Sequence, residues 1–449
     1  MIYREAVIKK RYVKDLPAEF ISANPYLIYK LITTAYHNGD MNEYMRYSNL
    51  LNERAGEIAA KYPDLLQTFG LARVINPHVP LKEHAKGLLK LIEHMPKIAA
   101  NTNTNIGTMT QNLPFFHRSL RDLSECYELK AEDLELFKAS IGVLMNKDYE
   151  VMKQALFAGV NYERGQLLDA VHHALIGKEA CLEGIHPETR FSANMILAAV
   201  LYAMGDFRDA ANVMAQTEIF IEEKARFLYP NFKALQTERV IRSDNKEAAQ
   251  KQAQDWLAVY ANSAERLPFY QICRHFTSLR SCIALEDYKA AVDFGKRIQQ
   301  LAADYKRPLD RIESGILTAI ALWGKGDKYN AAEEMEQALL IAKPYGFIQL
   351  FINEGKEILP LLWMIRKKTD IDSQLAQFID TLTQRISGFD GKRGEPEQAP
   401  HLSVMRRKML DYLNKGMSYN EIADKTGIVR GTVKRHVLLL YKQLGVNSG

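Results

Sequence analysis

The chain has 449 residues, of which 47% are apolar and 25% are charged, a composition typical of globular proteins that excludes global disorder. The net charge of +5 is too small for the whole chain to bind nucleic acid through bulk charge. Residues 402–449 contain nine Lys or Arg against three Asp or Glu, a charge of +6, which leaves −1 for residues 1–401. A near-neutral body with a small basic tail indicates two separate tasks.

The cysteines and the apolar stretches indicate where the protein resides. Cys126, Cys181, Cys273 and Cys282 are far apart and form no C-x-x-C pair, which predicts neither a disulfide framework nor a zinc site. Four free thiols favour a reducing cytoplasm. The longest apolar stretches, such as residues 195–204, are about half as long as a membrane span, and no signal peptide is evident. We therefore expect a cytoplasmic protein without membrane contact.

Residues 20–390 have the pattern of an all-α repeat. Apolar residues recur at intervals of three and four, and short turns with Gly, Asp or Asn separate the predicted helices. Four residues after the polar residue of five such turns stands an alanine: Ala170, Ala210, Ala248, Ala291 and Ala331. The intervals of 40, 38, 43 and 40 residues predict a superhelix of tetratricopeptide-like hairpins, in which the small alanine allows close helix packing.

Two stretches depart from this period. A turn at residues 38–40 predicts an earlier hairpin that begins near residue 24, with Tyr44 in place of the alanine. Residues 101–116 are rich in Asn and Thr and lead into the aromatic and basic cluster Phe115, Phe116, His117 and Arg118. Long loops in compact arrays are often functional, so this cluster is a candidate ligand-binding site. Alternatively, the stretch is a disordered insertion whose aromatic residues return to the core, and the array is a protein-binding scaffold.

The end of the chain predicts a linker and a small helical domain. Residues 391–400 contain two Gly and two Pro but no large apolar residue, which predicts a flexible linker, 391–401, between a repeat domain, 1–390, and a C-terminal domain, 402–449. In the latter, Ser418 and Glu421 predict a capping box at the start of a second helix. A third helix would bury Val433 and Val437, and the three helices together predict a helix-turn-helix.

Residues 420–423 (NEIA), 432–436 (TVKRH) and 441–446 (YKQLGV) closely resemble the DNA-binding domain of LuxR-type transcription regulators. The repeat region looks like the sensor region of the large MalT-type members of that family, and residues 345–355 are similar to a segment near the end of their repeats. The resemblance implies that Arg435 faces the major groove, that Lys434 contacts a backbone phosphate, and that Thr432 supports insertion of the helix. The DNA-binding residues that we predict are Arg430, Thr432, Lys434, Arg435 and Lys442.

The tail also departs from the family. Val429 stands where a capping Ser is usual, and Arg406 and Lys408 stand where acidic residues are common, so non-specific DNA affinity is expected to be higher. Leu438 and Leu439 replace polar residues and are candidate partner contacts. The MalT-type members normally begin with an ATP-binding domain, but no G-x-x-x-x-G-K-[ST] motif occurs here, and the family continues into a fourth helix. The chain is either naturally short or a fragment.

No catalytic or metal-binding pattern is evident, because the sequence lacks H-E-x-x-H, G-x-S-x-G and G-x-G-x-x-G. We therefore expect a transcription regulator, not an enzyme, without cofactor or metal. Its repeat domain would sense a small-molecule or protein signal and control a tail that binds double-stranded DNA. RNA polymerase and a second copy of the chain are further candidate partners. The alternatives are an interaction scaffold whose tail no longer binds DNA and a DNA-binding subunit that works with a separate ATPase polypeptide.

Overall fold

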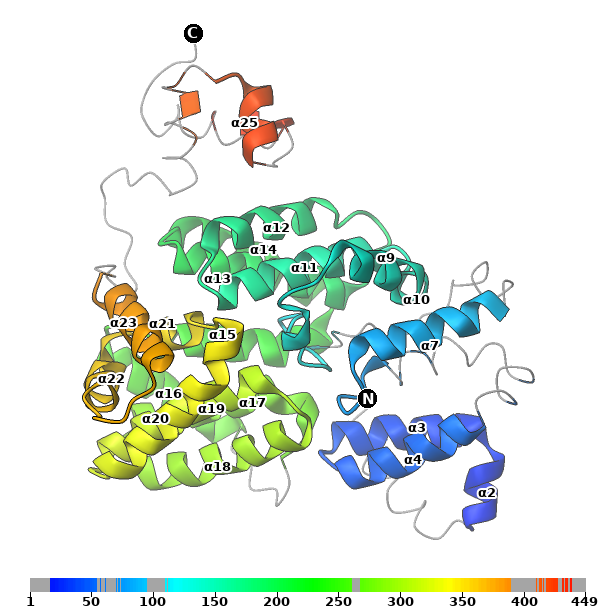
Figure 1. Cartoon of the computed structure of the whole chain (residues 1–449), viewed down its shortest axis with the longest axis horizontal. Helices are drawn as coiled ribbons and strands as arrows, with labels where there is room; N and C mark the ends of the chain where they lie inside the picture. The colour runs from blue at the N-terminus through cyan, green and yellow to red at the C-terminus, as the bar shows by residue number, and fades with distance from the viewer. Residues whose placement is uncertain are drawn as a thin grey trace.

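The computed structural model (Figure 1) describes residues 17–54, 57, 61, 70, 72, 74–94, 110, 112–260, 267–388, 409, 412, 413, 415, 417–426, 430, 431, 433, 434 and 437. Every regular element among these residues is a helix. Their one pairing of extended backbone is an isolated bridge between Arg118 and Asp122. The predicted all-α fold is therefore confirmed for the described part of the chain.

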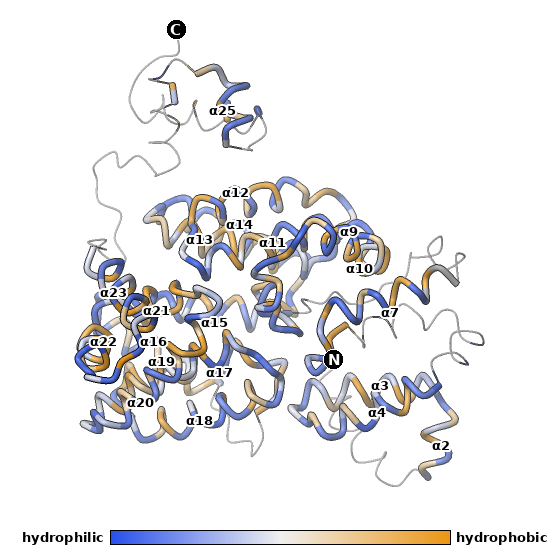
Figure 2. The backbone as a smooth tube through the Cα atoms, viewed as in Figure 1, coloured by the Kyte–Doolittle hydropathy of each residue, from blue (hydrophilic) through white to orange (hydrophobic). Residues whose placement is uncertain are grey.

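Five helical hairpins follow one another between residues 148 and 342 (Figure 1). Their first helices are α11 (Asp148–Glu163), α13 (Pro187–Ala203), α15 (Tyr229–Ile241), α17 (Ile272–Ala284) and α19 (Pro308–Gly324). Their second helices are α12 (Leu167–Glu179), α14 (Phe207–Lys224), α16 (Lys246–Tyr260), α18 (Tyr288–Asp304) and α20 (Lys328–Ala342). Polar and apolar residues alternate along these helices (Figure 2), as expected when one side of each helix packs against its neighbours.

The recurrent alanine occupies one position in all five second helices. The backbone N–H of this residue donates to the carbonyl of the residue just before the helix, and the residues are Ala170, Ala210, Ala249, Ala291 and Ala331. All are at most 5% exposed, as close packing of the helices requires. The prediction of Ala248 was wrong by one residue, because Asn245 and not Asp244 precedes α16. The Asn245 side chain instead accepts a hydrogen bond from the N–H of Ala248, at 3.0 Å.

The predicted early hairpin consists of α3 (Pro25–His37) and α4 (Met41–Glu53), and a short helix, α2 (Ala18–Ala23), precedes it. Tyr44 is fully buried in place of the alanine. Figure 1 shows α3 and α4 beside α17 and α18. The rings make this contact: the centroid of Tyr36 lies 5.0 Å from that of Phe269 and 4.8 Å from that of Tyr305. The first hairpin therefore packs against one that comes much later in the sequence.

The region after α20 closes the array at its other end. It contains α21 (Gln349–Glu354), α22 (Leu359–Arg366) and α23 (Ser373–Ser387). The N–H of Ile348 donates to the carbonyl of Glu163 at the end of α11, at 2.8 Å. The side-chain amide of Asn353 donates to the hydroxyl of Tyr162, at 3.1 Å. The region after α20 thus contacts α11, the first helix of the five hairpins, and the array encloses an interior.

The remaining helices are α7 (Leu81–His94), α9 (Ala131–Ala139), α10 (Ile141–Met145) and the 3₁₀ turns η1 (Ser124–Cys126), η2 (Arg226–Leu228), η3 (Phe269–Gln271), η4 (Lys343–Tyr345) and η5 (Gly355–Ile358). No described helix has both the length and the apolar character that a membrane span requires.

Residues 113–126, which we call the internal segment, run through the interior of the array. Polar side chains of this segment are buried, and they include Ser119, Arg121 and Asp122. The backbone carbonyl of Ser119 accepts from Arg307 at 2.8 Å, and the Asp122 carboxylate accepts from the N–H of Leu309 at 2.9 Å. These hydrogen bonds fix the segment to the start of α19.

In the C-terminal region, α25 (Tyr419–Thr426) begins with the predicted capping box. The N–H of Ser418 donates to the Glu421 carboxylate at 2.7 Å, and the N–H of Glu421 donates to the Ser418 hydroxyl at 3.3 Å, so this prediction is confirmed. Ile422, Val433 and Val437 are fully buried, as the predicted packing of the three helices requires. The predicted linker, 391–401, lies outside the described residues.

Candidate ligand-binding site

The interior of the array contains a partly open cavity with a volume of about 160 Å³. A cavity of roughly 150 Å³ holds one benzene molecule, so this one can hold a small ring. Its apolar wall is formed by Phe115, Met195, Ala198, Ala199, Tyr202, Ala203, Phe207, Met214, Leu235, Leu350 and Ile352. Its polar lining is formed by His117, Arg118, Tyr162, Glu163, Glu238, Arg239, Arg242, Glu313, Gln349 and Asn353.

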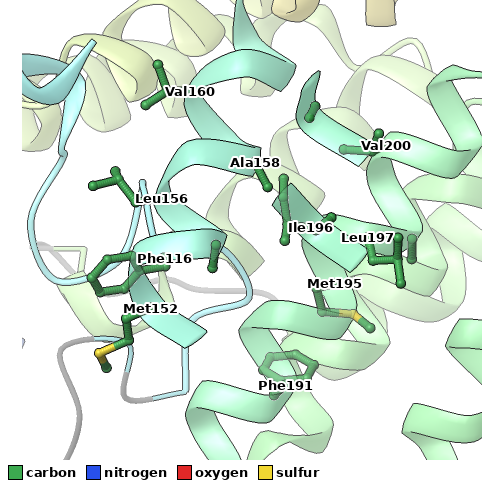
Figure 3. Close-up of a cluster of buried hydrophobic side chains, with 14 of the residues drawn as sticks. Phe116, Met152, Leu156, Ala158, Val160, Phe191, Met195, Ile196, Leu197 and Val200 are labelled. Carbon is green, nitrogen blue, oxygen red and sulfur yellow. The ribbon is translucent and has the colours of Figure 1, made fainter. Parts of the chain in front are cut away.

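Small residues of α13 leave the space for this cavity. The helix buries Phe191, Ile196 and Val200 among neighbouring apolar side chains (Figure 3). Ala198 and Ala199 lie on the side that lines the cavity, where a larger side chain would fill it. The apolar spacing predicts the helix, but it does not distinguish the side that packs from the side that lines a cavity.

An ionic network borders the cavity. It alternates carboxylates and guanidinium groups in the order Asp310, Arg118, Glu313, Arg280, Glu354 and Arg242. The shared Glu313 carboxylate is 2.9 Å from Arg280, and Arg118 is 2.7 Å from Asp310. The members come from the internal segment, α17, α19, α21 and the end of α15. The network therefore joins parts of the chain that are far apart in sequence.

Burial and the arginines have opposite effects on the carboxylates of this network. Burial alone would raise the pKa of Asp310, but Arg307 and Arg118 outweigh it and hold the pKa below its usual value. Burial also opposes ionisation of Glu313, whose pKa is nevertheless lowered, chiefly by Arg118 and Arg280. Both groups are thus anionic at neutral pH. Each carboxylate contacts two arginines, so loss of one arginine removes a charge-assisted contact and leaves the second. The loss of such a contact typically costs about 1.5–3 kcal/mol.

His117 joins the internal segment to α11. Its Nε2 atom lies 3.1 Å from a carboxylate oxygen of Glu163, and both side chains are 2% exposed. A Cβ atom added at Gly159 would lie 1.9 Å from Nδ1 of His117, so the glycine is required for the ring to lie this close to α11. The second carboxylate oxygen of Glu163 is buried and has no hydrogen-bond partner among the described residues.

Glu238 and Arg239, neighbours on α15, have no ion-pair partner among the described residues. Burial raises the pKa of Glu238, although Arg280 and Arg242 act in the opposite direction. The guanidinium of Arg239 lies over the ring of Tyr202, 4.7 Å from its centroid, and burial lowers the pKa of this group. The cavity thus has a positioned cation that no carboxylate of the described chain neutralises.

The predicted ligand-binding cluster is divided between the cavity and the core. Phe115, His117 and Arg118 line the cavity. Phe116 is 7% exposed and lies near Met152 and Leu156 of α11 (Figure 3), so we leave it out of the candidate site. Tyr202, Glu238 and Arg239 were not predicted from the sequence, because a Glu-Arg pair in an amphipathic helix is also the pattern of an ordinary solvated face.

The predicted DNA-binding residues are described only in part. Arg430 and Lys434 are exposed, while Val433 and Val437 of the same stretch are fully buried. Three further predicted DNA-binding residues, Thr432, Arg435 and Lys442, lie outside the described residues, as do the candidate partner contacts Leu438 and Leu439.

The cysteines form no disulfide bonds. All four cysteines are free thiols, and burial raises the pKa of Cys181 and of Cys282 to about 11, which keeps both protonated at neutral pH. Among the described residues, no group of three or more His, Cys, Asp or Glu side chains is arranged to hold a metal ion.

A curved array of two-helix repeats around a lined interior defines a protein of the tetratricopeptide-repeat class. Residues 83–368 match the family described as the MalT-like TPR region, and the chain belongs to this family. The predicted MalT-like helical region is thereby confirmed, and the matched residues end before the tail.

The chain is also similar to the HTH-type transcriptional regulator MalT of Vibrio cholerae serotype O1, with 25% identity over 198 residues. The similarity covers 39% of this chain and 22% of that relative, so the chain spans about a fifth of the length of the relative it matches.

Proposed function

We propose that the chain is a DNA-binding transcription regulator, in which the array receives a signal in its cavity and the tail binds double-stranded DNA. The observation that carries the proposal is the tail, in which Arg430 and Lys434 are exposed beside the buried Val433 and Val437. This is the pattern of a helix that packs on one side and can present cations to phosphates on another. The similarity to a protein named as an HTH-type transcriptional regulator supports the same function.

The ionic network gives the array a means of responding to a ligand. A ligand changes an equilibrium only when it binds one arrangement better than another. Because Arg118, Arg242 and Glu313 both line the cavity and join separate elements, occupancy of the cavity can favour one curvature of the array. We propose Leu438 and Leu439 as the contact through which the tail registers that change. If Leu438→Asp leaves assembly, DNA binding and the response to the signal unaltered, these leucines have no such role.

Selection from a random duplex library with the full chain tests DNA binding. We expect a preferred sequence, and Arg435→Ala should relax the preference at one position, at a cost of about 1–3 kcal/mol. Lys434→Ala should weaken binding to all sequences alike. Failure to enrich any duplex would contradict the proposal and favour the interaction scaffold. If a nucleotide-binding protein is purified together with the DNA-binding chain, the chain would instead be a DNA-binding subunit that works with a separate ATPase polypeptide.

A further inference from the structure

We propose that the cavity binds a small organic anion, consisting of one aromatic ring or a compact alkyl group joined to a carboxylate that Arg239 recognises. This inference rests on the proposed function in one respect, since it names the chemical class of the signal. The binding event itself involves only the array.

Arg239 is the group that selects for negative charge. The other two arginines of the cavity are already paired: Arg118 contacts Asp310 and Glu313, and Arg242 contacts Glu354 at 3.1 Å. Arg239 has no such carboxylate among the described residues, and stacking on Tyr202 holds its planar group in place. A guanidinium presents two parallel N–H donors that match a carboxylate, so a ligand carboxylate supplies the missing counter-charge.

The acidic groups of the cavity do not oppose an anion to the same degree. Glu313 is bridged by two arginines, and Glu163 is paired with His117. Burial raises the pKa of Glu238, Arg280 and Arg242 act against this, and its carboxylate accepts a hydrogen bond from the Thr277 hydroxyl at 3.2 Å. Each acid of the cavity therefore has a polar partner, whereas Arg239 has no carboxylate partner among the described residues.

The apolar lining of the cavity sets the rest of the ligand. Met195, Ala199 and Phe207 come from consecutive helices and present only apolar atoms to the cavity, and Phe115 adds an aromatic ring from the internal segment. The volume of about 160 Å³ corresponds to a single ring with a short side chain. A longer molecule would exceed this volume, and a fully polar molecule would make no apolar contact with these side chains.

Calorimetric titration of the full chain with hydrocinnamate and two isosteric ligands tests the proposal. Hydrocinnamate has a phenyl ring and a carboxylate, and hydrocinnamamide and phenylpropylamine replace the carboxylate with a neutral and a cationic group. We expect saturable binding of the acid and binding of the amide that is weaker by about tenfold or more, the usual size of a charge-assisted hydrogen bond. The amine should bind least.

Three variants locate the binding. Arg239→Gln should weaken binding of hydrocinnamate by about tenfold or more, and Arg239→Lys should fall between, because lysine keeps the charge but not the paired donors. Ala199→Phe should abolish binding by filling the cavity. The matched control is Arg208→Gln, because Arg208 is exposed on the neighbouring α14 and does not line the cavity. Helical circular dichroism and the melting midpoint verify that each variant is folded.

Four results would overturn the proposal. These are equal binding of the acid and the amide, preference for the amine, binding that Arg239→Gln and Ala199→Phe leave unchanged, and no saturable binding at millimolar concentration by any of hydrocinnamate, benzoate, phenylacetate and methylvalerate. The titration contains no DNA. A chain that binds the acid through Arg239 but binds no duplex would retain this inference and lose the proposed function, and the converse result would do the opposite.

Discussion

The regular hairpins and the internal segment differ in which residues they bury and in how far away in sequence the contacting residues lie. In the hairpins, each second helix repeats one buried alanine and contacts mainly its neighbours in the sequence. In the internal segment, the buried groups include His117, Ser119 and Asp122, and their partners are up to about 190 residues away. The contacts between neighbouring hairpins therefore stabilise the repeat without fixing how many hairpins it has. The long-range contacts of the internal segment instead fix the curvature of this array and the position of its cavity.

This difference predicts where substitutions are costly. Nearest-neighbour contacts in a repeat are partly redundant, so the loss of an exposed pair there is small. A buried charged group that joins remote segments is costlier to remove, because its polar partners stay in the interior with fewer hydrogen bonds.

The largest effect is expected for Arg307→Met. The buried guanidinium pairs with Asp310 and donates to the carbonyls of Ser119 and Arg118, at 2.8 Å each. Its loss leaves Asp310 with Arg118 alone and leaves two carbonyls without these donors. We expect the free energy of unfolding in urea to fall by about 3–5 kcal/mol. The control is Arg366→Met, which breaks an exposed pair with Asp380 and should leave the urea midpoint unchanged. Equal effects of the two variants would show that the internal segment is no different from the hairpins.

Gly159→Ala should have the next largest effect. The added methyl group would lie 1.9 Å from Nδ1 of His117, so the ring must move away from Glu163. Overpacking of this kind usually costs about 1–3 kcal/mol, which thermal unfolding can detect. Gly431→Ala is the matched control, since a Cβ atom there meets no described atom within 4 Å. Unchanged stability of the Gly159 variant would mean that the contact between the internal segment and α11 contributes little.

Ser418→Ala tests whether the tail is a separate unit from the array. It removes the hydroxyl that accepts from the N–H of Glu421, and the loss of such a cap costs about 1 kcal/mol. Hydrogen exchange measured on the full chain should become faster in α25 and remain unchanged in α11–α20. Faster exchange throughout the array would contradict the separation.

The smallest effect is expected for Glu238→Gln, and it depends on pH. Because burial raises the pKa of Glu238 in the folded chain, ionisation opposes folding, and stability is lost as the pH rises through that pKa. The glutamine remains neutral, so the variant should match the wild type near pH 4 and be more stable at pH 7. Asp310, whose pKa is lowered, contributes in the opposite sense, with stability that is lost as the pH falls. A variant that is less stable than the wild type only at pH 7 would reverse the sign that we assign to Glu238.

Local patterns predicted the repeats, since a helix, its turn and the packed alanine are all encoded within about 40 residues. The single error, Ala248 for Ala249, arose where Asp244 and Asn245 are both plausible caps. Three residues of the predicted cluster at 115–118 line the cavity. Consecutive side chains of non-helical backbone point to different sides, and Phe116 thus enters the core. The contribution of Arg239 could not be predicted, because it depends on the curvature of the whole array.

The salt dependence of DNA binding by the full chain tests the proposed function most directly. Between about 50 and 200 mM salt, we predict that the affinity for the selected duplex falls steeply, and that Lys434→Ala reduces the slope of log K against log salt by about one unit. An affinity that is insensitive to salt, or the same slope for the wild type and Lys434→Ala, would contradict the assignment of the tail as the DNA-binding element.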